Sequence, residues 1–198
     1  MTSLSLDHNL VSPEASAGIA RVLARSGTLT ALNLSNNALL EAGTRTLCRA
    51  LGANTALTQL GLGGNKIGPE GAVAVSTALR QNSCLRVLDL SGNKISGQVF
   101  AFEKWGNGSY DASGVTAIAE ALGVNGTLTS LDLSGNSLCG LDRAGRGAYT
   151  TEGIDTVRRA VEVNAALTAL NLRSNNLDAS ALQAMRDAAA RRSLAVEL

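Results

Sequence analysis

Asp89 and Asp132 are the residues of this sequence best placed to do chemistry together. They occupy equivalent positions in two copies of the segment Leu-Asp-Leu-Ser-Gly-Asn, at 88–93 and 131–136. If these segments lie side by side, the carboxylates form a pair that can share a proton or attract a basic group. Acid–base catalysis also needs a pocket and partner groups within reach. No Ser/His/Asp or Cys/His arrangement accompanies the pair, so we predict no catalytic residue and no enzymatic activity.

Aromatic and cationic residues gather in two stretches with the composition of loops. Phe100, Phe102 and Trp105 fall within QVFAFEKWGNGS, and Arg143 and Arg146 fall within GLDRAGRGAY. Such side chains, held on a rigid scaffold, commonly anchor protein–protein interfaces. The alternative is that the aromatic residues fold back on the scaffold as a small satellite core. The sequence leaves both interpretations open, and the arginines are expected either to supply polar rim contacts or to lie in a flexible loop.

The remaining reactive side chains indicate neither a metal site nor a cofactor site. The single histidine, His8, falls in a turn, and Cys48, Cys84 and Cys139 are too scattered for a disulfide framework or a zinc motif. Glycines at 61, 63 and 64 match neither GxGxxG nor GxxxxGK[ST], so they predict no nucleotide-binding loop. We therefore expect no metal ion and no cofactor.

One template, L-x-x-L-x-L-x-x-N-x-(L/I), recurs along the whole chain and is clearest at Leu57–Ile67. The L-x-L alternation predicts a short strand whose leucines share one face, which a neighbouring repeat must bury. Apolar residues three and four apart between the templates predict one helix per repeat. Each template asparagine is expected to satisfy buried backbone groups of its own and the next repeat. These asparagines are Asn9, Asn37, Asn65, Asn93, Asn136 and Asn175, separated by 28, 28, 28, 43 and 39 residues.

This pattern resembles the ribonuclease-inhibitor-like class of leucine-rich repeats, which also occurs in NOD-like receptors and in Ran GTPase-activating proteins. The resemblance covers almost all of the 198 residues. It implies an α/β solenoid shaped like a horseshoe, built from six β–α repeats of about 28 residues. A parallel sheet would line the concave face and helices the convex face. We accordingly predict a single domain over residues 1–198.

Two adjacent repeats are longer than the others, and their extra residues fall at the same place. Alignment of the glycines at 43, 71, 114 and 153 puts the insertions between template and helix, at about 96–110 and 139–149. The insertions should therefore emerge side by side. Tyr110 and Tyr149 end them with the spacing of a hydrophobic staple. Residues 194–198 alternate like one more strand, and neither end shows a polar cap, so either end could dock on a partner or on another copy.

Charge and hydropathy exclude several classes of partner. The 17 basic and 16 acidic residues nearly balance, which leaves no overall field to attract nucleic acid. No stretch reaches the ~20 apolar residues of a membrane span. The first ten residues lack the features of a secretion signal, so an intracellular, cytoplasmic location is predicted.

These observations predict a non-catalytic protein-interaction scaffold or assembly subunit, which binds protein partners through the insertions and the concave face. Two alternatives follow from the resemblance. One is a GTPase-activating regulator similar to Ran GTPase-activating proteins, and the other is a sensor or adaptor module of a larger receptor or effector. No arginine of this chain matches a motif of the GTPase regulators, so that alternative rests on fold analogy.

Overall fold

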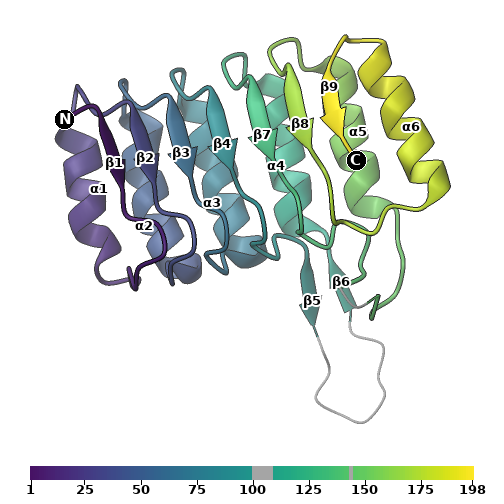
Figure 1. Cartoon of the computed structure of the whole chain (residues 1–198), viewed down its shortest axis with the longest axis horizontal. Helices are drawn as coiled ribbons and strands as arrows, with labels where there is room; N and C mark the ends of the chain where they lie inside the picture. The colour runs from purple at the N-terminus through teal and green to yellow at the C-terminus, as the bar shows by residue number, and fades with distance from the viewer. Residues whose placement is uncertain (100–108, 143–144) are drawn as a thin grey trace.

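A parallel sheet of very short strands forms one layer of the molecule (Figure 1). The computed structural model describes residues 1–99, 109–142 and 145–198. The sheet has seven strands in the order β1-β2-β3-β4-β7-β8-β9. Each strand is three residues long because the L-x-L alternation is that short. The strands are β1 (Ser3–Ser5), β2 (Ala31–Asn33), β3 (Gln59–Gly61), β4 (Val87–Asp89), β7 (Ser130–Asp132), β8 (Ala169–Asn171) and β9 (Ala195–Glu197).

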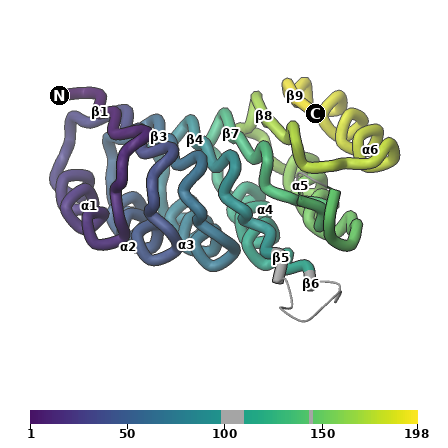
Figure 2. The backbone as a smooth tube through the Cα atoms, turned by 60° about the horizontal axis from the view of Figure 1, so that its bottom comes forward, coloured from purple at the N-terminus to yellow at the C-terminus, as the bar shows by residue number. Residues whose placement is uncertain are grey.

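Within the described residues, six helices cover one face of this sheet, and the predicted α/β solenoid is confirmed. Figure 2 shows the two layers following a common arc, with the strands on its inner, concave side. Packed helices need ~8–10 Å of spacing whereas paired strands need ~4.8 Å, which bends the stack toward the strands. The helices are α1 (Ser16–Arg25), α2 (Leu40–Ala53), α3 (Gly68–Gln81), α4 (Ser113–Val124), α5 (Glu152–Val163) and α6 (Ala179–Ala190).

The core is the space between the two layers. Leu60 of β3 and its neighbours Leu32 and Leu88 point into it at identical strand register. Val75 and Leu79 project into it from α3 and are fully buried. Because all repeats contribute to this one apolar layer, each repeat depends on its neighbours for burial.

A row of asparagines seals the turn after each strand. Nδ2 of Asn65 donates to the carbonyl of Leu62 in its own repeat (3.0 Å) and to that of Leu34 in the preceding repeat (2.8 Å). The main-chain N–H of Asn65 itself donates to Oδ1 of Asn93 (2.7 Å). We expected these side chains to bond to the next repeat, but they bond to the preceding one. The contact with the next repeat is made instead by the main-chain N–H of the asparagine. The buried members of the row are Asn37, Asn65, Asn93, Asn136 and Asn175.

Asn9 differs from the other five, since its repeat has no predecessor among the described residues. It is exposed, and its Nδ2 donates to the carbonyls of Leu6 (3.1 Å) and Asp7 (3.0 Å) in its own turn. The prediction that each template asparagine satisfies buried backbone groups is therefore wrong at Asn9.

A second asparagine row, absent from the sequence-based prediction, seals the opposite edge where each helix ends. Nδ2 of Asn54 donates to the carbonyl of Leu23 in the preceding repeat (2.7 Å), and its Oδ1 accepts from the N–H of Leu57 (2.7 Å). In the last repeat Arg192, one residue after the C-cap of α6, donates to the carbonyl of Glu162 (3.1 Å). The row comprises Asn54, Asn82, Asn125 and Asn164, all buried.

The first insertion begins and ends as a β-hairpin, which the sequence did not predict. β5 (Gly97–Val99) pairs antiparallel with β6 (Ser109–Asp111), and the pair projects from the edge of the solenoid (Figure 1). Phe100, Phe102 and Trp105, together with Arg143 of the second insertion, lie outside the described residues. Both the interface and the satellite-core interpretations of the aromatic residues therefore stay predictions.

The first and last helices expose different kinds of residue. Helix α6 exposes Gln183, Arg186 and Asp187, whereas Val22 of α1 is 49% exposed and Leu10 before it is 91% exposed. The predicted last strand, β9, forms. Docking of either end on a partner or on another copy stays a prediction.

Candidate functional site

A depression lies where the concave strands of the middle repeats end, and we call it the carboxyl-edge pocket. Its volume is about 720 Å³. Small residues make room for it: each turn after β3, β4 and β7 carries a glycine with positive φ, at Gly64 (68°), Gly92 (63°) and Gly135 (65°), where a side chain would be strained. The lining residues are Ser35, Asn36, Gly63, Gly64, Asp89, Ser91, Gly92, Lys94, Ser134, Gly135, Ser137, Asp142, Arg146 and Ser174.

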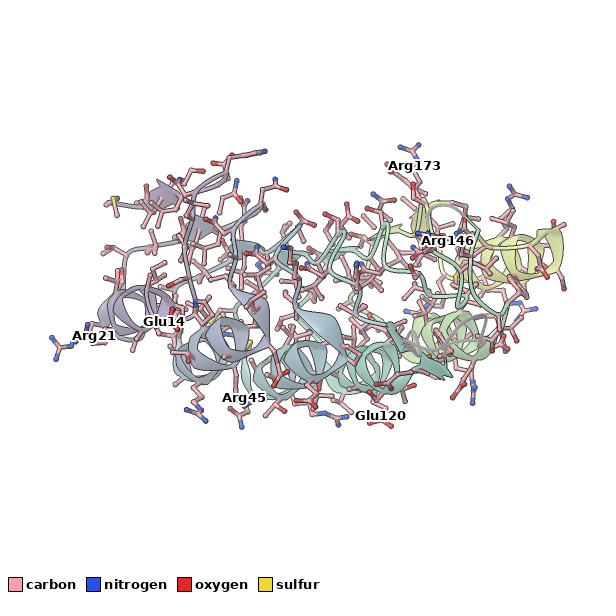
Figure 3. The ribbon with its side chains drawn as sticks, turned by 90° about the horizontal axis from the view of Figure 1, so that it is seen from below. Glu14, Arg21, Arg45, Glu120, Arg146 and Arg173 are labelled. Carbon is pink, nitrogen blue, oxygen red and sulfur yellow. The ribbon has the colours of Figure 1, made fainter. Side chains whose placement is uncertain are left out.

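The second insertion supplies one wall of this pocket. Arg146 forms an ion pair with Asp142 (2.7 Å), and its main-chain N–H also donates to Oδ1 of Asp142 (2.9 Å). Nδ2 of Asn176 in the last repeat donates to the carbonyl of Asp142 (2.7 Å). The ion pair therefore closes the described part of this insertion on itself, and Asn176 fastens it to the last repeat. Figure 3 shows Arg146 on the strand side of the molecule.

The two aspartates singled out from the sequence lie opposite each other on β4 and β7, but their surroundings differ. Oδ1 of each accepts the N–H of a serine two residues later, Ser91 or Ser134 (both 2.8 Å). Oδ2 of Asp132 accepts in addition a hydrogen bond from Nδ2 of Asn171 (2.9 Å). Asp89 lines the carboxyl-edge pocket and Asp132 does not. Asp89 therefore shares this pocket with Arg146, and the acid pair as a whole does not.

The described parts of the two insertions lie close together, and a tyrosine joins each one to the next repeat. The hydroxyl of Tyr110 on β6 donates to the carbonyl of Leu138, where the second insertion begins (2.7 Å). The hydroxyl of Tyr149 accepts the N–H of Asp178, the N-cap of α6 (3.2 Å). Burial raises the pKa of Tyr110 to about 12, so its hydroxyl keeps its proton to donate at neutral pH.

The substitution Tyr110→Phe is expected to lower the free energy of unfolding by about 1–2 kcal/mol, because it leaves the Leu138 carbonyl without this donor. Urea denaturation measures the change. Tyr149→Phe is the matched control, since Tyr149 is 40% exposed and water can replace its contact, so its effect should be below about 0.5 kcal/mol. Equal effects of the two substitutions would contradict the role assigned to Tyr110.

Among the described residues, those that line the carboxyl-edge pocket include no cysteine and no histidine, and two cysteines elsewhere are buried. Burial raises the pKa of the Cys48 thiol to about 12 and that of Cys139 to about 11, which keeps both thiols protonated and unreactive. Across residues 1–99, 109–142 and 145–198, no group of three or more His, Cys, Asp or Glu side chains is arranged to hold a metal ion. In the same ranges no helix is both long enough and apolar enough to cross a membrane.

The convex face offers a second, shallower groove, between α2 and α3. It has a volume of about 610 Å³ and is lined in part by Val73, Ala74 and Arg49. The charge of Arg45 on its rim is neutralised by ion pairs with Glu41 and Glu70. Figure 3 shows Arg45 and Glu120 pointing away from the sheet into solvent, as expected for a solvated helix face.

Comparison with protein families assigns the repeating unit. A family profile described as "Leucine Rich repeat" matches residues 53–76, 81–98 and 163–185, and a second, described as "Leucine Rich Repeat", matches residues 127–145. The matched segments are leucine-rich repeats. The ribonuclease-inhibitor-like class within these repeats stays a prediction. No curated protein sequence matches the chain.

Solved structures with the same leucine-rich-repeat architecture include two domains of low sequence identity. The Caenorhabditis elegans tropomodulin C-terminal domain superposes with a TM-score of 0.62 at 13% identity, over 91% of this chain and 92% of that one. The structure titled "Leiomodin-1 Actin-Binding Site 2 (ABS2)" gives 0.57 at 20% identity, over 83% of this chain and 80% of that one. At these identities the likeness shows the fold alone.

Proposed function

We propose that this chain is a non-catalytic protein-binding module whose partner occupies the carboxyl-edge pocket and the neighbouring insertions. The observation that carries the proposal is the wall formed by Asp142 and Arg146. This wall encloses one side of a sheet edge that would otherwise be shallow. Binding residues are commonly carried by loops that a rigid scaffold positions. Here the fastening through Asn176 supplies that rigidity.

The chemistry of the pocket suits a polar, extended segment of a protein. Its floor consists of hydroxyl groups and exposed main chain of Ser35, Ser91 and Ser134, and both signs of charge stand at its border, on Asp89 and Lys94. Such a surface makes many weak, partly water-mediated hydrogen bonds and discriminates by charge placement. A small apolar ligand would leave those polar groups without partners.

Phe100, Phe102 and Trp105 enter this proposal as the apolar anchor, and Arg143 as a rim contact. They are connected to the described hairpin β5–β6 and to the second insertion. Aromatic residues dominate the energy of protein interfaces and polar rim residues contribute less. In this proposal the pocket gives polar selectivity and the aromatic residues supply affinity.

The proposal also names a first partner to test, two alternative roles, a surface for self-association and a location. Actin is the first partner to test, because the leiomodin-1 structure of the same architecture is titled an actin-binding site. Stimulation of a GTPase is the alternative from fold analogy, and a sensor or adaptor role in a larger receptor or effector is another. Self-association would use the apolar N-terminal end around Val22. We place the module inside the cell, in the cytoplasm.

Photo-crosslinking tests the proposed surface with and without actin. A benzophenone amino acid replaces Lys94, which is exposed at the pocket, or Phe102 in the first insertion. The matched control replaces Thr77, which is exposed on the convex helix α3. We expect Lys94 and Phe102 positions to crosslink to one and the same protein, at least about fivefold above Thr77. Crosslinking that is strongest from Thr77 would contradict the proposal.

A further inference from the structure

The third repeat interrupts a row of polar side chains along the concave face. At the two outward positions of each repeat, β2 and the residues after it carry Asn33 and Ser35, and β4 carries Asp89 followed by Ser91. The third repeat carries Gly61 and Gly63 instead. Because these two glycines have no side chains, the side chains of the neighbouring strands β2 and β4 lie close to the main chain of the third repeat.

Oxygen atoms from both flanks converge on these glycines. A Cβ at Gly61 would lie 2.6 Å from Oδ1 of Asn33, and a Cβ at Gly63 would lie 2.7 Å from Oδ2 of Asp89 and 2.7 Å from Oγ of Ser91. These atoms are acceptors or hydroxyl groups. The third repeat is therefore a cradle of acceptors on the concave face.

The strand register explains why one carboxylate oxygen of this cradle lacks a partner. Asp132 has Asn171 opposite it on β8, and that amide donates to Oδ2 of Asp132. Asp89 has Gly61 opposite it on β3 and Asp132 on β7. Glycine has no side-chain donor and Asp132 is an acid. Across the described residues, no protein donor reaches Oδ2 of Asp89.

An apolar side chain, Val87, lies on the same strand face as this carboxylate. A second concave depression, of about 430 Å³, is lined by Ala31, Gln59, Gly61, Val87 and Asp89 among others. Val87 is 38% exposed there. Methyl groups beside a carboxylate suit a side chain with an aliphatic stem and a cationic tip, as in lysine and arginine.

We propose that the cradle around Gly61 and Gly63 binds a lysine or arginine side chain of the protein partner. The stem lies over Val87, and the cation donates to Oδ2 of Asp89 and to Oδ1 of Asn33. This inference rests on the proposed protein-binding function and names one residue type that the partner must present. Arg146 does not compete for Asp89, because Asp142 holds it in an ion pair.

Titration with single amino-acid amides tests the site without a known partner. N-acetyl-lysine methylamide and N-acetyl-arginine methylamide are added to the ¹⁵N-labelled full chain, and amide chemical shifts are recorded. We expect saturable shifts centred on Gly61, Gly63 and Ser91. N-acetyl-norleucine methylamide has a similar stem without the charge and should produce no saturable shift.

Three variants locate the binding on Asp89. Asp89→Asn keeps the acceptor for the Ser91 N–H and removes the charge, and it should weaken lysine and arginine amide binding by about tenfold or more. Asp132→Asn removes the neighbouring charge and is the matched control, with a change below about threefold. Gly61→Asn places a donor opposite Asp89, as Asn171 stands opposite Asp132, and should also abolish binding. The second and sixth repeats carry asparagine at this position, Asn33 and Asn171, and the closest atom to a Cβ at Gly61 is the side-chain oxygen of Asn33, so folding of this variant is checked by circular dichroism.

The outcomes separate this inference from the proposed function. Equal losses in Asp89→Asn and Asp132→Asn, or saturable binding of the norleucine amide, would overturn the cradle. In photo-crosslinking from Lys94, Asp89→Asn should reduce partner capture about tenfold, whereas capture that persists unchanged would overturn the cradle and leave the protein-binding function standing. Amide binding at Asp89 with no crosslinked partner would instead support the cradle and contradict the proposed function.

Discussion

Replacement of Asn93 by alanine is expected to lower the free energy of unfolding by about 3–5 kcal/mol. Nδ2 of Asn93 donates to the carbonyls of Leu62 (2.9 Å) and Leu90 (3.0 Å), and Oδ1 accepts the N–H of Asn65 (2.7 Å). Alanine leaves the Asn65 N–H buried without a partner, which costs about 1–3 kcal/mol. It also removes one of the two donors to each carbonyl, because Asn65 still donates to Leu62 and Asn136 to Leu90, and each lost hydrogen bond costs about 0.5–1.5 kcal/mol. Urea denaturation of the two proteins, followed by circular dichroism, measures the difference.

Asn9→Ala is the matched control, because Asn9 occupies the same template position but is exposed. Its two carbonyl partners lie in its own turn, where water can replace the amide, so the expected loss is below about 1 kcal/mol. A similar loss in both variants would mean that the asparagine acts within its own turn. The link between repeats, which distinguishes Asn93 from Asn9, would then contribute nothing measurable.

The template predicted the buried asparagines after the strands because leucine periodicity and asparagine coincide there. The second row was missed although its signal is present: Asn54, Asn82, Asn125 and Asn164 each stand three residues before the first template leucine. These residues follow helices, so a search centred on strands passes over them. Burial at Asn9 was overestimated because the sequence pattern is the same with or without a preceding repeat to cover it.

The candidate site was less predictable, because it depends on which residues face each other across strands. Asp89 and Asp132 are identical in local sequence, and they differ only through Gly61 and Asn171 on the outer strands. The staple spacing of Tyr110 fitted contacts within one repeat, whereas the bond that the structure shows from its hydroxyl to Leu138 depends on the paths of both insertions. The repeated pattern thus predicts the strands, helices and buried asparagines that all repeats have in common. The candidate site is formed by residues at which the repeats differ, such as Gly61 and the two insertions.

Replacement of Gly114 by alanine is expected to lower the free energy of unfolding by about 2–4 kcal/mol. Gly114 lies in the first turn of α4, and a Cβ there would lie 2.2 Å from the carbonyl oxygen of Ile95 and 2.7 Å from Cα of Pro69. Both atoms are main chain, so no side-chain rotation can relieve the overlap. The added methyl group must therefore push α4 away from α3, and such overpacking typically costs about 1–3 kcal/mol, occasionally more. Thermal and urea denaturation measure the loss.

Gly123→Ala tests the same substitution near the other end of the same helix. There the nearest atom to an added Cβ, Cγ2 of Val163, is 4.0 Å away, which is ordinary contact. The helix interior favours alanine over glycine by about 0.5–1 kcal/mol, so this variant should be more stable than the parent. Opposite signs at two positions of one helix would show that close approach of the main chains of neighbouring repeats, rather than helix propensity, requires Gly114. A stabilising Gly114→Ala would contradict the close packing of α4 on the start of α3. The hairpin β5–β6 immediately precedes α4 in the chain.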